Sequence, residues 1–173
     1  MFGSFERSGV TAQIRHFKAL GIWENSIGFT APEAFSFGPD VERLVGLFNL
    51  TNERLRAFYA YADLKDIICA KKPSTPSLDI SRELLGVFWL TYFGEQYCRF
   101  FGRDKVTTLS AASPGPGNGV TLRLAPSAAQ TSDGLRQRLE GVLGAESFAG
   151  NGGVKARGQF AMTLAQLASE LVR

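Results

Sequence analysis

The sequence predicts an α+β protein: a single domain over residues 1–173, with an antiparallel-rich sheet and helices packed mainly on one side. Segments with the two-residue alternation of strands are mixed with segments of helical spacing, and the two kinds do not follow the regular order of a parallel sheet. An apolar content of 45% in 173 residues is enough to form one core without disulfides or metals. No internal repeat is visible.

Two strands are expected first, and a helix follows them. Apolar and polar residues alternate over 10–15, and residues 22–30 supply a second strand after a turn at 19–21. Pro39 then opens a helix, because proline suits the first helical position and acidic residues in the first turn face the positive end of the helix dipole. The apolar face of this helix comprises Val41, Leu44, Val45 and Phe48.

The next segment repeats the helical spacing after Thr51 and Asn52. The residues that carry this spacing are Leu55, Phe58, Tyr59 and Ala62. We expect a second helix capped at Thr51; the alternative is one long helix with a weak point. A short strand is expected over 66–70 and a surface loop over the sequence KKPSTPS at 71–77.

The run from Gly86 to Gly102 is dense in aromatic rings. Its first part, 86–93, predicts a buried strand because it is short and rich in β-branched and aromatic residues, although a helix remains possible. After Gly94 the spacing of Tyr97, Phe100 and Phe101 predicts a short helix over 95–101 that stops at Gly102.

The last part predicts a hairpin and two helices. Alternation over 106–110 and 120–125, on either side of PGPGNG at 114–119, indicates two strands with a long glycine-rich turn. Thr131 or Ser132 caps a helix that ends before Gly144 and has Leu135, Leu139 and Val142 on one face. After a loop or weak strand at 150–158, Thr163 caps a helix over 164–172.

Composition favours a cytoplasmic protein. The two cysteines, Cys69 and Cys98, form no CxxC pair, which indicates free thiols in a reducing compartment. The amino terminus has no signal-peptide pattern, and the longest apolar run is too short to cross a bilayer. A net charge of +3 without a dense basic run favours an ordinary mixed surface.

Few residues are suited to catalysis. His16 is the single histidine, so histidine-dependent nucleophile mechanisms would all rest on it, and a structural role is the simpler interpretation. We expect no metal site and no cofactor, because neither zinc nor calcium spacing occurs and the glycine-rich segments lack the features of a phosphate loop. Two alternatives stay open. One is an enzyme that uses Cys98 or a carboxylate; the other is a single-stranded nucleic-acid binder using Arg99, Arg103, Lys105 and Arg123 beside aromatic rings.

The segment WLTYFGEQYCRFFGRDKV at Trp89–Val106 resembles the central motif of immunity proteins of bacterial polymorphic-toxin systems. In that motif an aromatic strand and a glycine lead into a short helix, and a glycine and a charged residue follow. The strand GVTLRLA and a helix ending LEGVLGAESF come next in the family's order. The chain is similar in this way to the Immunity protein 52 family over Leu84–Phe148, and departs from its pattern in the long PGPGNG turn and after Phe148.

The resemblance implies a protein without enzymatic activity, made beside a toxin gene, that binds the cognate toxin domain and blocks its active site or substrate path. It further implies a toxin of restriction-endonuclease-like nuclease fold that acts in the cytoplasm. We expect a monomer or weak dimer that contacts neither a membrane nor, directly, nucleic acid.

A nuclease groove is basic, so an inhibitor that fills it should present carboxylates and an aromatic anchor. The candidate toxin-interface residues are Glu33, Asp40, Glu42 and Glu53, with Phe35 or Phe37 as the anchor. The alternative is that these acids only favour the helix terminus and that the phenylalanines are buried.

Overall fold

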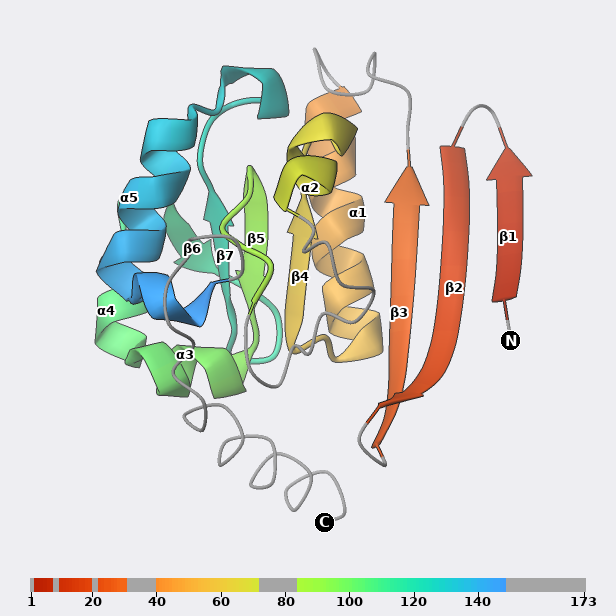
Figure 1. Cartoon of the computed structure of the whole chain (residues 1–173), viewed down its shortest axis with the longest axis horizontal. Helices are drawn as coiled ribbons and strands as arrows, with labels where there is room; N and C mark the ends of the chain where they lie inside the picture. The colour runs from red at the N-terminus through yellow and green to blue at the C-terminus, as the bar shows by residue number, and fades with distance from the viewer. Residues whose placement is uncertain (1, 8–9, 20–21, 31–39, 72–83, 149–173) are drawn as a thin grey trace.

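The computed structural model describes residues 2–7, 10–19, 22–30, 40–71 and 84–148, and it confirms the α+β class (Figure 1). An antiparallel meander of three strands comes first, in the order β1-β2-β3, and an antiparallel sheet of four strands has the order β4-β5-β7-β6. The strands are β1 (Phe2–Arg7), β2 (Val10–Ala19), β3 (Ile22–Thr30), β4 (Tyr59–Ala62), β5 (Leu90–Phe93), β6 (Ala112–Pro114) and β7 (Val120–Arg123). The helices are α1 (Asp40–Leu55), α2 (Lys65–Lys71), α3 (Glu95–Phe101), α4 (Arg103–Thr107) and α5 (Asp133–Leu143), with short 3-10 turns η2 (Ala128–Gln130) and η3 (Ala145–Ser147).

The strands expected over 10–15 and 22–30 are confirmed as β2 and β3, and β2 continues to Ala19. The first strand, β1, was not expected, because FGSFER alternates too weakly to predict a strand on its own. It forms by pairing with β2, from Phe2 opposite Arg15 to Arg7 opposite Val10.

Residues 40–62 form one helix and one strand, so the prediction of a second helix capped at Thr51 was wrong. α1 runs without interruption to Leu55, and Asn52 is buried within it. Arg56 then adopts a left-handed backbone with φ of 48°, which ends the helix. Tyr59–Ala62 pairs with β5 in place of continuing the helical spacing, because tertiary pairing outweighs local preference.

The strand expected over 86–93 is confirmed only for Leu90–Phe93, although the whole stretch from Leu84 is buried. Both neighbouring strands offer only four residues to pair with, so the ladder cannot extend further back. Side chains accept the hydrogen bonds that a neighbouring strand would otherwise accept. The amides of Val87, Phe88 and Trp89 donate to the side chains of Glu140, Thr91 and Asp63, respectively, at 2.8–2.9 Å.

The helix over 95–101 and its stop at Gly102 are confirmed as α3. The strand expected over 106–110 is wrong, because 103–107 form α4 and bury Val106 in the core. The second strand expected over 120–125 is confirmed as β7; it pairs in a hairpin with β6 at 112–114, which was not expected, and in the turn between them Gly115 donates to the Gly119 carbonyl at 2.9 Å. Gly117 and Asn118 take left-handed backbones there, with φ of 55° and 60°.

α5 begins where expected, since the Ser132 hydroxyl accepts from the Leu135 amide at 3.3 Å, but Val142 is exposed and Leu143 takes its place in the core. The expected strand over 66–70 is wrong, because 65–71 form helix α2. The predicted loop at 71–77 extends beyond the described residues, and the predictions for 150–158 and 164–172 lie wholly outside them.

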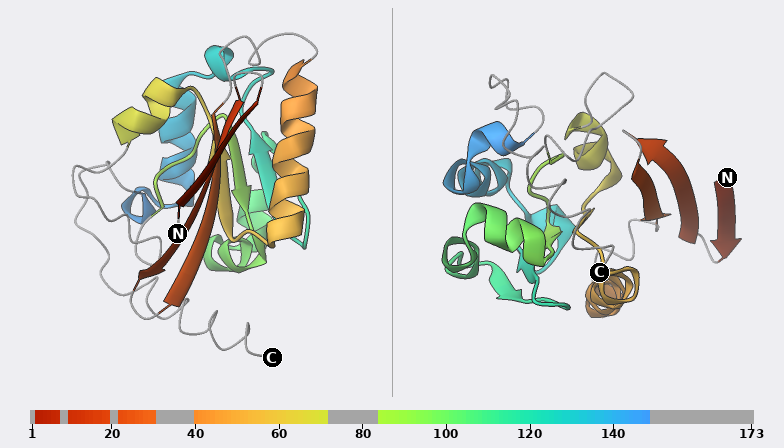
Figure 2. Two further views of the ribbon diagram at one scale, coloured as in Figure 1. Left: turned by 90° about the vertical axis from the view of Figure 1, so that its right-hand side faces the viewer. Right: turned by 90° about the horizontal axis from the view of Figure 1, so that it is seen from below.

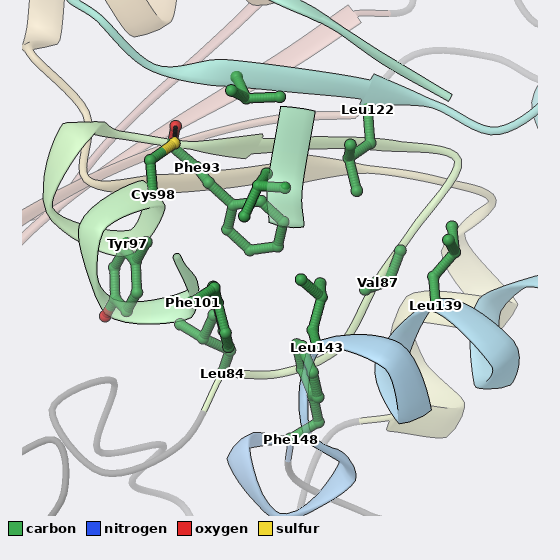
Figure 3. Packing of buried hydrophobic residues seen from close by; sticks show 12 residues of the cluster. Leu84, Val87, Phe93, Tyr97, Cys98, Phe101, Leu122, Leu139, Leu143 and Phe148 are labelled. Atoms are coloured by element: carbon green, nitrogen blue, oxygen red, sulfur yellow. Dashed lines mark hydrogen bonds between the residues drawn. The ribbon is translucent and has the colours of Figure 1, made fainter. Parts of the chain in front are cut away.

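The described helices lie on both faces of the four-stranded sheet, with α3, α4 and α5 toward one face and α1 toward the other (Figure 2). The larger core fills the α3–α5 side, where Phe93 meets Phe101 edge-on at 5.3 Å between ring centroids and Phe101 stacks on Phe148 at 5.9 Å (Figure 3). The aromatic run is therefore core, and most of the helices do lie on one side.

Two glycine-to-alanine changes should have opposite signs. A Cβ at Gly94 would lie 2.8 Å from the Ala57 carbonyl oxygen, a backbone atom that cannot move aside, whereas a Cβ at Gly141 on α5 would meet nothing within 4 Å. Gly94→Ala should lower the free energy of unfolding by about 1–3 kcal/mol. Gly141→Ala should raise it by about 0.5–1 kcal/mol, since alanine favours the helix. Urea denaturation measures both, and equal effects would contradict this account of Gly94.

Candidate protein-binding site

Helix α1 presents three different sides. Its inner side packs through Val41, Val45 and Phe48 on the cluster that holds Trp89 and Leu90. Among the described helices, α1 is the one on this face of the sheet, so no other described helix covers the side opposite these residues (Figure 2).

The side of α1 next to β7 is fixed by polar contacts. Arg123 of β7 donates to Glu42 at 2.8 Å, and the Thr121 hydroxyl donates to the Asn49 side chain at 3.1 Å. The hydrogen bond from Arg123 lowers the pKa of Glu42, so this carboxylate stays ionised at mildly acidic pH. Glu42 thus helps to orient α1 on the sheet.

The side of α1 that faces away from the sheet carries Arg43, Gly46, Leu50 and Glu53, spaced at i, i+3, i+7 and i+10; we call these four residues the outer ridge. Leu50 is 49% exposed, and a Cβ on Gly46 would meet nothing within 4 Å. A glycine inside a helix costs about 1 kcal/mol relative to alanine, and the surroundings of Gly46 offer no packing reason for it. The ridge therefore combines an exposed apolar side chain, a shallow notch and charged ends, as a protein-binding surface does.

Three of the six predicted interface residues lie on α1, at different positions along it. Asp40 accepts from Arg43 at 3.0 Å at the start of the helix, and Glu53 is exposed on the outer ridge. Glu42 is also exposed but is engaged by Arg123. The other three, Glu33, Phe35 and Phe37, lie outside the described residues.

Sequence reasoning missed Leu50 and Gly46. Leu50 follows the apolar residues of α1 in the sequence, but it falls outside their stripe on the helix surface. Both residues precede Thr51, so a projection of the helix predicted from Pro39 would already have shown that Leu50 lies off the stripe; only the structure shows that this side of the helix is open.

Cys98 is poorly placed for nucleophilic chemistry. It is buried in the core, its thiol donates to the Phe93 carbonyl at 3.3 Å, and burial raises its pKa, which favours the protonated form. Among the described residues, no group of three histidine, cysteine, aspartate or glutamate side chains is arranged to hold a metal ion. Within the same ranges, no helix has the length and apolar character needed to span a bilayer.

Three of the four basic residues considered for nucleic-acid binding have other contacts. Arg99 pairs with Glu95 one turn earlier, and Arg103 donates to the Asn118 carbonyl at 2.6 Å. Arg123 is held by Glu42, while Tyr97 and Phe101 are buried in the core. These rings and guanidinium groups therefore do not form an open platform on which bases stack.

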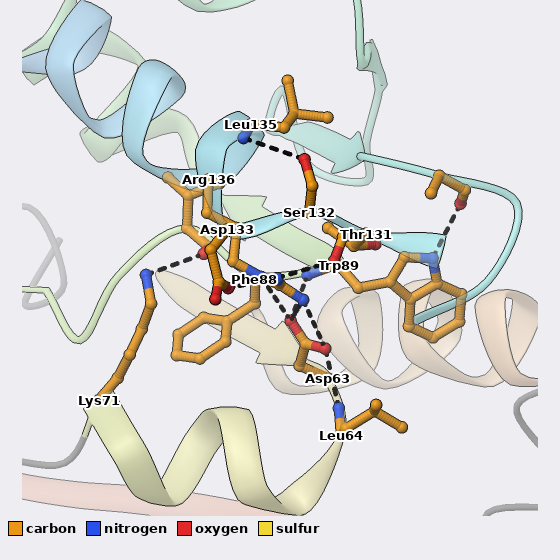
Figure 4. A network of polar contacts seen from close by, with 12 residues as sticks. Asp63, Leu64, Lys71, Phe88, Trp89, Thr131, Ser132, Asp133, Leu135 and Arg136 are labelled. Atoms are coloured by element: carbon orange, nitrogen blue, oxygen red, sulfur yellow. Dashed lines mark hydrogen bonds and ion pairs between the residues drawn. The ribbon is translucent and has the colours of Figure 1, made fainter. Parts of the chain in front are cut away.

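A buried ionic network joins β4 and α5, and buried charges often mark functional sites (Figure 4). The side chains of Arg136 and Asp63 are 2% and 0% exposed, and Arg136 donates to both carboxylate oxygens, at 2.8 and 3.0 Å. Asp63 also accepts from the Leu64 and Trp89 amides, both at 2.9 Å. Each carboxylate oxygen thus has several donors, and the pair joins the end of β4 to α5 as a structural contact.

A second ion pair involves Glu140, which lies one turn after Arg136 on α5. Lys71 at the end of α2 pairs with the buried carboxylate of Glu140, and its ammonium group lies 5.2 Å from the centre of the Phe88 ring. Glu140 also holds the Val87 amide, and the Tyr59 hydroxyl donates to the Gly86 carbonyl. These contacts fix the segment before β5 from both sides.

Removing one partner of the buried pair should be costly. Arg136→Ala leaves the Asp63 carboxylate buried and without its main counter-charge, so the free energy of unfolding should fall by about 3–5 kcal/mol. Arg43→Ala is the matched control: it breaks an ion pair whose arginine side chain is 84% exposed, and it should cost less than about 1 kcal/mol. Chemical denaturation measures the free energy of unfolding of both variants. Similar losses would show that the buried pair contributes no more to stability than the exposed pair.

No protein-family model, curated protein or solved structure matches the chain. The functional assignment therefore rests on the residues of α1 and on the order of motifs in the sequence.

Proposed function

We propose that this protein is an immunity protein, which binds a cognate bacterial toxin domain and neutralises it by covering its active site or substrate path. The observation that carries the proposal is the outer ridge of α1, where Leu50 is 49% exposed beside the open notch of Gly46. The resemblance of the strand, glycine and helix at 89–106 to immunity proteins supports the same assignment.

The proposed inhibition is steric and electrostatic. The partner is a nuclease of restriction-endonuclease-like fold that acts in the cytoplasm, and its groove carries the lysine and arginine residues that bind phosphates. Glu53 and Asp40 offer carboxylates to such a surface, and Leu50 offers an apolar contact between them. A stable complex needs about 800 Å² of buried surface per partner, so α1 forms the centre of a larger contact.

The first test is protection in cells. The open reading frame beside the gene for this protein should encode a toxin whose expression stops growth, and co-expression of this protein should restore growth. The purified pair should also form a complex by size-exclusion chromatography. If the neighbouring product is harmless, or if growth is not restored, the proposed function is wrong.

The second test places the interface on α1. Leu50→Arg and Gly46→Trp should each weaken binding at least about tenfold in calorimetry, because each puts bulk or charge at the centre of the contact. Asp40→Lys combined with Glu53→Lys should also weaken binding, through charge; Glu42 is left in place because Arg123 holds it. Gly141→Trp on α5 is the control, since that glycine is equally open and lies on a different helix.

Unchanged affinity for the α1 variants, in a protein that still protects cells, would move the interface elsewhere without removing the proposed function. A loss for Gly141→Trp alone would place the interface on α5.

A further inference from the structure

The turn between β6 and β7 contains an Asn-Gly pair that its geometry requires. Gly117 and Asn118 both have left-handed backbones, with φ of 55° and 60°, and the Gly119 amide donates to the Pro116 carbonyl at 2.9 Å. This is the arrangement of a type I′ turn, in which asparagine is one of the few residues with a side chain that fit. Gly119 has no room for a side chain, because a Cβ there would lie 2.5 Å from the ring of Tyr92.

An asparagine followed by glycine is prone to deamidation, because no side chain shields the next backbone nitrogen, which is the nucleophile. That nitrogen loses its proton to hydroxide and attacks the side-chain Cγ atom. A C–N bond forms, and the side-chain nitrogen takes a proton from water and leaves as ammonia. Water then opens the cyclic imide at either carbonyl, which gives aspartate or isoaspartate. The Asn118 residue is exposed, so water and hydroxide reach it.

Tyr92 restrains this nucleophile. Its hydroxyl donates to the Pro116 carbonyl at 2.8 Å, and the same oxygen accepts from the Gly119 amide; we call Tyr92, Pro116 and Gly119 the turn clamp. The Gly119 nitrogen must leave this hydrogen bond before it can lose its proton, and the buried Tyr92 ring packs against it. Burial also raises the pKa of Tyr92, so its hydroxyl remains a donor in mildly alkaline solution.

We propose that Asn118 is a site of spontaneous deamidation and that the turn clamp sets its rate, because the reaction needs a local opening of the turn. The product adds a negative charge, and its isoaspartyl form also adds a carbon to the backbone. Both changes fall on the residue whose carbonyl accepts from Arg103 of α4 at 2.6 Å. The modification therefore alters the contact between the hairpin and α4. This inference does not depend on the proposed function.

The chain provides a matched reference for the test, because the tripeptide Gly-Asn-Gly occurs both at 117–119 and at 150–152. The full chain is incubated in mildly alkaline buffer, and mass spectrometry of its peptides follows the replacement of NH₂ by OH at Asn118 and Asn151. Tyr92→Phe, which removes only the clamping hydroxyl, should speed the reaction at Asn118 about fivefold, the factor expected for one ordinary hydrogen bond. The rate at Asn151 should be the same in both proteins.

Ser132→Ala is the control for a general loss of stability. It also removes one hydroxyl and one hydrogen bond, at the start of α5 and beyond the opposite end of β7 from the turn, and it should leave the rate at Asn118 unchanged. An equal acceleration by Ser132→Ala would mean that the reaction proceeds through global unfolding, and equal rates in wild type and Tyr92→Phe would mean that the clamp has no effect; either result overturns the proposal.

A measurement on the wild-type protein alone completes the test. In urea that unfolds the chain, Asn118 and Asn151 should react at similar rates, since their immediate neighbours are identical. In buffer, Asn118 should react more slowly than it does in urea. Equal rates at Asn118 in the two solutions would show that the folded turn gives no protection, and would overturn the proposal. The toxin is absent from these experiments, so their failure says nothing against toxin binding.

Discussion

The contact on which the rest of the structure depends is the buried pair of Asp63 and Arg136. Asp63 follows β4, Arg136 lies in α5, and the Trp89 amide that Asp63 also binds lies just before β5. Three segments that are distant in sequence therefore meet at one carboxylate (Figure 4). Taking two charges out of water is expensive, so the pair is best understood as fixing the position of these segments and not as a large net source of stability.

This constraint explains how the aromatic segment becomes core. Asp63 and Glu140 accept hydrogen bonds from the amides of Trp89 and Val87, and these contacts fix the direction in which the chain enters β5. Phe93 then points to the α3–α5 side. Tyr59, beside it on β4, is buried enough that desolvation raises the pKa of its phenol well above the ordinary value. The chain then turns at Gly94 into α3, which ends at Gly102, so α3 lies over Phe93.

The sequence predicted elements whose signals are local. Ser132 and Gly144 bound α5, Gly94 and Gly102 bound α3, and the alternation in β2 and β3 is clear without tertiary information. It failed where tertiary contacts decide, since β4 has a helical pattern but pairs with β5, and α4 has a strand-like pattern but buries Val106. The buried Asp63–Arg136 pair could not be predicted, because nothing local links residues so far apart. Of the candidate site, the acids of α1 were predicted, whereas the exposure of Leu50 and the open space at Gly46 depend on which side of α1 the sheet covers, and no local signal gives that.

The way in which side chains satisfy the amides of Val87, Phe88 and Trp89 has a consequence for self-association. A stretch so rich in aromatic residues has high β-propensity, and a free row of its amides would be a template for cross-β stacking between molecules. Here the carboxylates of Glu140 and Asp63 and the hydroxyl of Thr91 already take those three donors inside the fold. The segment most prone to amyloid-like pairing is thereby kept from it for as long as these three side chains remain in place.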